Sequence, residues 1–123
     1  MPWVALIAAA LSITSMAGCA IIEDVFSGRS DTYIGTVAFG FEESGFRPCN
    51  VAEQWWITGG DMVNDLQSRY NDLGVKWYEP VFAELKGDPS QKGQYGHLGA
   101  YQREFEVSEV IEMRLLEAGE CRP

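Results

Sequence analysis

Three cysteines, Cys19, Cys49 and Cys121, are the residues of this 123-residue chain whose type and spacing most directly indicate chemistry. An odd number of cysteines indicates that one of them has a role other than an internal disulfide. Cys19 stands apart from the other two, because it follows two small residues at the end of an apolar stretch that begins at Trp3. The surroundings of Cys19 therefore indicate which of the three cysteines has a role other than a disulfide.

The junction formed by residues 15–19 resembles the lipobox of bacterial lipoprotein signal peptides. The apolar run 3–13 has the length of a signal h-region, roughly 7–15 residues, and is shorter than the about 20 residues of a spanning helix. The resemblance implies that residues 1–18 are a signal peptide and that Cys19 carries a diacylglycerol thioether and an acyl chain such as palmitate on its amine. Two departures are the absence of Lys or Arg before the run and Met16 in place of the usual Leu. A cleaved secretory signal and a simple N-terminal anchor are the alternatives.

The subcellular location implied by this resemblance is the cell envelope. Two or more acyl chains suffice for stable membrane anchoring. Residue 20 is Ala rather than the Asp that favours inner-membrane retention in Gram-negative lipoproteins. We therefore expect attachment to the outer membrane, facing the periplasm.

Lipidation of Cys19 would leave Cys49 and Cys121 as one pair in an oxidising compartment, where disulfides persist. We expect this pair to form a disulfide that ties the C-terminal end back to the early part of the domain. In the chain-entropy account, closing a loop of that length stabilises the fold by about 4 kcal/mol. The alternative is two free thiols.

His97 is the single histidine, and it does not predict a metal site. A zinc site needs three or four N or S ligands, which the chain cannot assemble once Cys49 and Cys121 are paired. The glycines around His97 favour a structured loop in which it makes hydrogen bonds to the backbone. The glycine spacing of residues 93–99 does not predict a phosphate loop, because no helix or Lys-Ser/Thr follows it. We expect no metal and no cofactor.

No catalytic constellation stands out either. Ser44 and Ser90 lack the sequence context of a hydrolase nucleophile. Glu42 and Glu43 are adjacent in an expected strand, so their side chains should point to opposite faces. We therefore expect a protein that is not an enzyme.

The pair Trp55-Trp56 is the strongest indication of a binding surface. Neighbouring strand residues face opposite ways, so one tryptophan should enter the core and the other should lie on the outer face. An outward tryptophan near Tyr95, His97 or Tyr101 would stack on a sugar, an aromatic ligand or a partner side chain. The alternative is that it caps one end of the fold.

The formal net charge of −9 excludes some partners. Nucleic-acid binding requires Lys and Arg to displace phosphate counterions, and an anionic membrane surface would repel this chain. Because the acidic residues are scattered, they indicate a solvated surface.

The residues after position 18 divide into a tether, 19–30, and one domain, 31–123. Apolar alternation and β-rich composition predict strands at 33–41, 53–58, 77–86 and 101–115. Phe41 shares the parity of Phe39 in the first strand, and Ile111 shares the parity of Phe105 in the last, so both are expected to face the core. Gly45 and Pro48 should break the chain after the first strand.

A helix is expected from Asp61, which should cap it, and residues 87–100 should form a long connection. Arg103 and Glu109 interrupt the apolar face of the last strand, as an internal ion pair or at a bulge. The helix should bury Met62, Leu66, Tyr70 and Leu73. Strands around one helix predict a mainly β, OB-like, partly open barrel, with an α+β roll as the alternative.

Three sequence blocks, residues 40–56, 80–87 and 93–101, together resemble a group of small, uncharacterised bacterial envelope proteins, many with lipoprotein signals. They are also distantly similar to the OB-fold half of the envelope-stress lipoproteins that sense copper and surface contact. That family carries a CxxC motif, which this chain lacks, so its metal role does not transfer.

These observations predict a membrane-anchored envelope lipoprotein whose domain binds a partner protein or envelope component. The alternatives are an enzyme or accessory protein acting on cell-wall material, and a small-ligand or metal sensor. Carboxylates or His97 converging in a concave pocket would favour an enzyme. A closed barrel with an exposed apolar patch would favour a binding module.

Overall fold

The computed structural model describes residue 28 and residues 30–121. The predicted signal peptide, Cys19 and most of the tether lie outside these residues. No helix in the described part of the chain is both long and apolar enough to cross a membrane.

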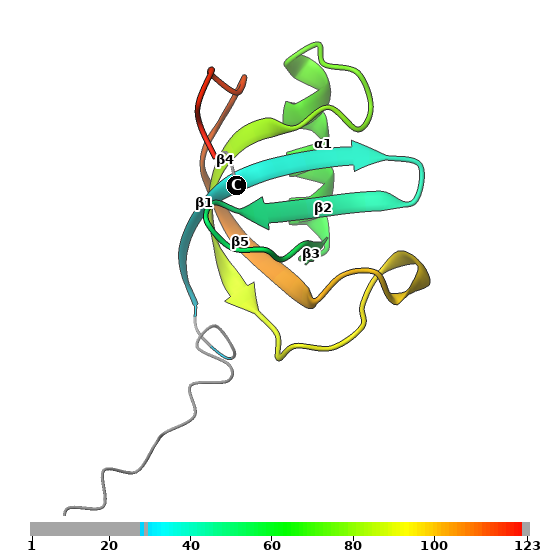
Figure 1. Ribbon diagram of the computed structural model, residues 1–123. Coiled ribbons are helices and arrows are strands. Elements are labelled where there is room, and N and C mark those ends of the chain that lie inside the picture. The colour runs from blue at the N-terminus through cyan, green and yellow to red at the C-terminus, as the bar shows by residue number, and fades with distance from the viewer. Residues whose placement is uncertain (1–27, 29, 122–123) are drawn as a thin grey trace, which may run out of the picture.

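Five strands form a closed barrel in the order β1-β2-β3-β5-β4, with one α-helix between β3 and β4 (Figure 1). β3 and β5 are parallel, and the other neighbouring pairs are antiparallel. This confirms the mainly β, OB-like fold class, and the barrel is closed rather than partly open because β4 also pairs with β1. The elements are β1 (Asp31–Gly40), β2 (Glu43–Pro48), β3 (Trp55–Thr58), α1 (Asp61–Asp72), β4 (Val81–Pro89), the 3-10 helix η1 (His97–Gly99) and β5 (Arg103–Arg114).

The hairpin of β1 and β2 departs from the sequence prediction in two ways. Residues 43–48 form a strand, although Gly45 and Pro48 were expected to break the chain there. Gly45 pairs with Ala38 and lies under the side chains of Gln54 and Tyr101, so the absence of a side chain is needed for packing. Pro48 is the last residue of the strand, a position that sheets tolerate. Phe41 was expected to face the core and instead lies in the turn, 71% exposed.

Helix α1 begins at Asp61 and ends at Asp72, and it buries Leu66 and Tyr70 against the barrel. Gly60 occupies the cap position that Asp61 was expected to fill. The Tyr70 hydroxyl donates to the backbone oxygens of Lys76 (2.9 Å) and Glu79 (2.7 Å). These contacts fasten the loop that follows the helix to the helix itself.

β4 and β5 differ from their predicted limits. β4 starts at Val81, directly after Pro80, and continues to Pro89. Two register shifts in its pairing with β5 change which face the later residues of β5 occupy. Ile111, expected inside, is therefore 47% exposed.

The centre of the barrel is a cluster of aromatic rings. Phe105 of β5 stacks on Phe46 with ring centroids 5.1 Å apart, and it meets Trp55 and Tyr33 edge-on at 5.2 and 5.5 Å. Phe105, Phe46 and Trp55 have no exposed surface. This aromatic cluster thus takes one residue from each of four strands.

Phe105→Ala is expected to lower the free energy of unfolding by about 3–5 kcal/mol, because it leaves a cavity between three rings. Leu98→Ala is the matched control: Leu98 is 90% exposed, and surface substitutions usually change stability by less than about 0.5 kcal/mol. Urea unfolding followed by tryptophan fluorescence measures both. Equal stabilities of the two variants would contradict the assignment of the core.

Candidate functional site

Of the two tryptophans predicted to form a binding surface, one lies in the core and the other packs against a loop. Trp55 points inward, and its indole N–H donates to Glu53 Oε2 at 3.0 Å. Trp56 points outward, as one of the pair was expected to do. Its ring packs against Tyr101, with centroids 4.9 Å apart, and against Gly96, where a Cβ would collide with the indole. Trp56 therefore serves mainly to hold the β4–β5 loop on the barrel.

Tyr95, His97 and Tyr101 hold the same loop. The backbones of Tyr95 and Tyr101 exchange two hydrogen bonds of 2.9 and 3.1 Å. Tyr101 is buried, and burial raises the pKa of its hydroxyl. His97 Nε2 lies 2.9 Å from Glu42 Oε2 in the β1–β2 turn, so the side chain joins two loops rather than only hydrogen bonding to backbone. The structure does not bring these residues together as a platform for a ligand.

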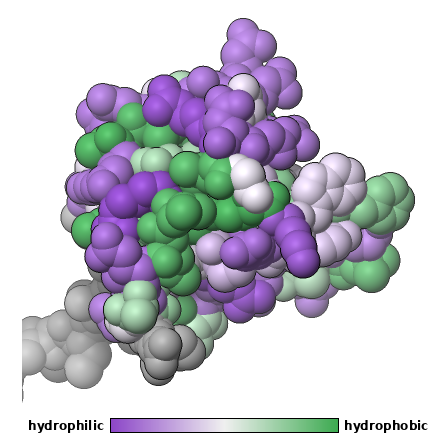
Figure 2. Space-filling model, turned by 90° about the horizontal axis from the view of Figure 1, so that it is seen from above, coloured by the Kyte–Doolittle hydropathy of each residue, from purple (hydrophilic) through white to green (hydrophobic). Residues whose placement is uncertain are grey.

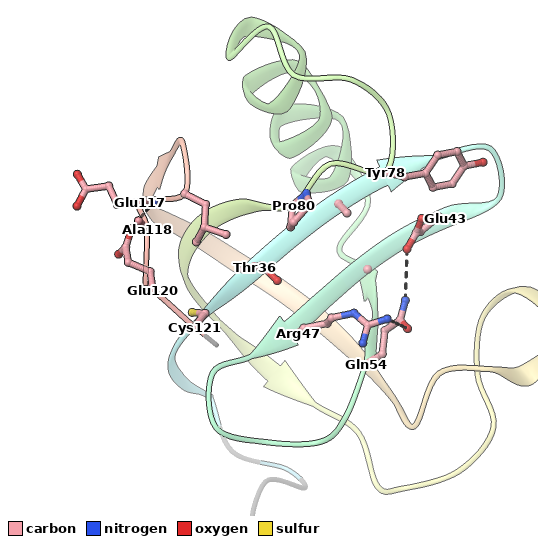
Figure 3. A pocket seen from close by; sticks show the side chains of 14 residues that line it. Thr36, Glu43, Arg47, Gln54, Tyr78, Pro80, Glu117, Ala118, Glu120 and Cys121 are labelled. Carbon is pink, nitrogen blue, oxygen red and sulfur yellow. Dashed lines mark hydrogen bonds between the residues drawn. The ribbon is translucent and has the colours of Figure 1, made fainter. Parts of the chain in front are cut away.

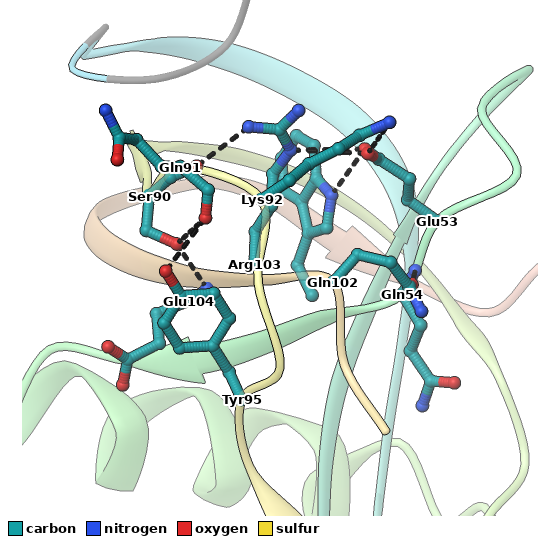
Figure 4. Close-up of polar contacts among 10 residues, drawn as sticks. Glu53, Gln54, Ser90, Gln91, Lys92, Tyr95, Gln102, Arg103 and Glu104 are labelled. Atoms are coloured by element: carbon teal, nitrogen blue, oxygen red, sulfur yellow. Dashed lines mark hydrogen bonds and ion pairs between the residues drawn. The ribbon is translucent and has the colours of Figure 1, made fainter. Parts of the chain in front are cut away.

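A buried ion pair lies beneath this loop (Figure 4). Arg103 Nε is 3.3 Å from Glu53 Oε2, and Arg103 is only 1% exposed. Arg103 Nη1 donates to the backbone oxygen of Ser90 at 2.8 Å, and Lys92 Nζ lies 3.3 Å from Glu53 Oε1. Arg103 forms an internal ion pair, as one of the two explanations held, but with Glu53 and not with Glu109. Glu109 is exposed and lies beside a register shift between β4 and β5. The partner Glu53 could have been found, because it shares the inward parity of Trp55.

The environment of Glu53 favours the ionised carboxylate. Burial alone raises its pKa, but hydrogen bonds from Trp55 and Arg103 and the charge of Arg103 outweigh burial. The pKa of Glu53 therefore lies below its ordinary value. The carboxylate loses its contribution to stability as the pH falls from the ordinary glutamate pKa, about 4.3, through the lower pKa of the folded state.

Glu53→Gln is expected to lower the free energy of unfolding by about 3–5 kcal/mol at neutral pH, since it leaves the Arg103 charge buried without a carboxylate. The double variant Glu53→Gln/Arg103→Met should recover part of this loss, and Glu104→Gln, on the exposed face, should be nearly neutral. Urea unfolding at several pH values is the measurement. The parent should lose stability as the pH falls below about 4.3, and Glu53→Gln should lose less over that interval. An identical acid profile would contradict the role of the pair.

A groove crosses the outer face of β1 and β2 (Figure 3). It consists of two cavities, of about 500 and 780 Å³, which share Thr36, Arg47, Gln54 and Cys121. The outer face of the hairpin carries small residues, Ala38 and Gly45, in the smaller cavity. These leave room that longer side chains would fill.

The C-terminal segment forms one wall of the groove. Residues 116–121 line the smaller cavity. A disulfide joins Cys121 to Cys49, as predicted, with the two Cα atoms 4.7 Å apart. Glu120 accepts two hydrogen bonds of 2.7 Å from Arg114, which lower the pKa of Glu120 to about 2. The predicted disulfide indicated that Cys121 lies near Cys49, but no sequence pattern indicated the contact of Glu120 with Arg114 or the cavity that residues 116–121 line.

A second surface lies at the tip of the β1–β2 hairpin. Four large apolar or aromatic side chains from three loops are exposed there: Phe41 (71%), Trp77 (58%), Tyr78 (53%) and Leu98 (90%). We call them the hairpin-tip patch. Tyr78 connects two of the loops, since its backbone N–H donates to Phe39 O (2.8 Å) and its hydroxyl to Phe41 O (3.1 Å). In Figure 2, which views the molecule from the top of Figure 1, pale and green atoms gather at the end where the hairpin lies.

The backbone at this patch is unusual. Glu42, Tyr78 and Leu98, one in each of the three loops, have φ angles of 55°, 69° and 57°. Non-glycine residues adopt this conformation at a cost, and such positions cluster at functional sites. The three loops are thus held in one arrangement that exposes apolar side chains.

Within the described residues, no group of three or more His, Cys, Asp or Glu side chains is placed to hold a metal ion. Comparisons with known protein families, curated proteins and solved structures found no match to this chain.

Proposed function

We propose that this protein is a non-catalytic binding module of the bacterial cell envelope, anchored through lipid on Cys19, whose hairpin-tip patch binds a partner protein. The observation that carries the proposal is the patch itself: Phe41, Trp77, Tyr78 and Leu98 exposed on three loops of a closed barrel. Contiguous exposed apolar surface is typical of interaction sites. Aromatic side chains are enriched in the centres of protein interfaces.

The rigidity of the patch supports binding. The contact between His97 and Glu42 joins the β4–β5 loop to the hairpin turn. Tyr78 joins the α1–β4 loop to the same hairpin through two hydrogen bonds. Loops that are already ordered lose little conformational entropy on binding, so more of the interaction energy appears as affinity.

The position of the patch favours a protein over the membrane that holds the anchor. β1 begins at Asp31, on the side of the chain that leads to Cys19, and ends at Gly40 beside the patch. Its ten residues, at about 3.3 Å each, separate the two ends. The patch therefore faces away from the anchored end of the domain.

The charge of the protein indicates the chemistry of the partner. The net charge is −9, and Glu42, Glu43 and Glu79 are sequence neighbours of the patch residues. A partner that offers an apolar centre surrounded by Lys and Arg would be attracted. The alternatives of a cell-wall enzyme and of a metal sensor have no comparable supporting observation in the described residues.

Phe41→Ser/Leu98→Ser is expected to reduce partner binding at least tenfold, because it removes apolar contact area on two of the three loops. Photocrosslinking in intact cells from position 76, an exposed residue next to Trp77, followed by identification of the joined protein, measures this. Ile111→Ser is the matched control, since Ile111 is an exposed apolar residue on β5, outside the patch. The partner surface should carry excess Lys and Arg, and high salt should weaken the purified pair. Undiminished crosslinking in the double variant would contradict the proposal.

Cys19→Ala is expected to abolish labelling with radioactive palmitate and to leave an uncleaved precursor, because the thioether cannot form. Cys49→Ala/Cys121→Ala is the control and should retain the label. Labelling of Cys19→Ala equal to that of the parent would contradict the lipid anchor. This result bears on the anchor alone and leaves the binding proposal to its own experiment.

A further inference from the structure

We propose that the larger half of the groove binds a small carboxylate-bearing ligand, with Arg47 as the anion-binding residue. This site lies on the outer face of β2 and is separate from the hairpin-tip patch. The inference goes beyond the proposed function and does not depend on it.

Arg47 differs from the other arginines that the structure describes. Arg69, Arg103 and Arg114 each lie 2.7–3.3 Å from a carboxylate oxygen. Among the described residues, Arg47 has no such ion pair, and its Nη2 donates to the neutral side-chain oxygen of Gln54 at 2.8 Å. The protein has twice as many Asp and Glu as Lys and Arg. An arginine whose side-chain partner is a neutral amide is therefore available to bind an anion.

Gln54 is held at its backbone, and its side-chain Nε2 donates to Glu43 Oε1 at 3.5 Å, so Arg47 is oriented before a ligand arrives. The Gln54 backbone N–H donates to Gln102 Oε1 at 2.6 Å, and the Gln102 backbone N–H donates to Gln54 O at 2.9 Å. A guanidinium has five N–H donors in a planar fork that matches a carboxylate. The single hydrogen bond to Gln54 leaves the other donors of Arg47 for a ligand.

The charges around the larger cavity favour an anion. Glu53 is the acidic residue that lines it, and Arg103 and Lys92 pair with that carboxylate. Arg47 is therefore the charge of this lining that has no carboxylate partner, and Glu43 lies in the adjoining smaller cavity, where it accepts from Gln54. Because the whole molecule is at −9, a carboxylate with one negative charge meets less repulsion than a phosphate with two.

The remaining lining residues indicate what accompanies the carboxylate. The cavity of about 780 Å³ has the size of a small-molecule site. Thr36, Asn50, Gln54 and Gln102 offer hydroxyl and amide groups, and Pro48, Val51 and Ala52 offer apolar surface. This lining fits a carboxylate with hydroxyl or amide groups, as found in an acidic sugar or at the C-terminus of a short peptide.

The test is titration of the purified, detergent-solubilised full chain, followed by NMR of its backbone amides. The two acids are glucuronate and N-acetyl-dialanine, and their neutral counterparts are glucose and N-acetyl-dialanine amide. Concentrations should reach about 10 mM, which detects binding in the millimolar range. We expect at least one acid to shift the resonances of residues 50–54 and its neutral counterpart not to do so.

Arg47→Gln should weaken binding of that acid about tenfold or more, and Arg69→Gln, at an exposed arginine on α1, should not. Arg47 is exposed, so the variant is expected to unfold at the parent temperature. Shifts with glucuronate alone indicate an acidic sugar, and shifts with the peptide acid alone indicate a peptide end. The proposal is overturned by equal binding of acid and neutral compound, by unchanged binding in Arg47→Gln, by stronger binding of inorganic phosphate, or by no shift with either acid.

Discussion

Arg103 enters the barrel interior beside Trp55, where a guanidinium has to be neutralised and its N–H donors satisfied. Glu53 supplies the charge from the loop before β3, and Ser90 supplies a carbonyl from the β4–β5 loop. One side chain thereby joins three segments that are far apart in the sequence. Both binding surfaces depend on these segments, because Gln54 follows Glu53 and the β4–β5 loop carries Leu98.

The disulfide acts at the end of the β1–β2 hairpin that lies away from its turn. Cys49 follows β2 directly, and Cys121 lies 72 residues later, so their bond holds the C-terminal segment across the face that β1 and β2 present. The pair of Arg114 and Glu120 holds the same segment from β5. One wall of the groove is thus the C-terminal segment, which a covalent bond and an ion pair hold in place. The floor of the groove is the sheet.

The larger half of the groove and the hairpin-tip patch share no residue, although Tyr78 of the patch also lines the smaller cavity. The hairpin-tip patch is apolar, lies at the ends of loops and is suited to a protein. The groove around Arg47 is polar, lies on a sheet face and is suited to a small anion. The hairpin of β1 and β2 contributes to both surfaces. Because the two ligands would contact different residues of the domain, a protein and a small ligand could bind at the same time. Coupling between them would have to pass through this hairpin.

The sequence by itself determined the fold class, the helix and the fact that one tryptophan of residues 55–56 faces the core, because periodicity is a local property. For Arg103 it offered an internal ion pair as one of two explanations, but the partner Glu53 was decided by the tertiary structure. The sequence also predicted the disulfide, through the cysteine count. It did not reveal β2, since a glycine required for packing looks the same as a glycine that ends a strand. It did not reveal the faces of Phe41 and Ile111, because a tight turn and two register shifts changed the parity on which their prediction depended. Both binding surfaces were decided by the tertiary structure alone: each combines residues from segments that only the closure of the barrel and the disulfide bring together.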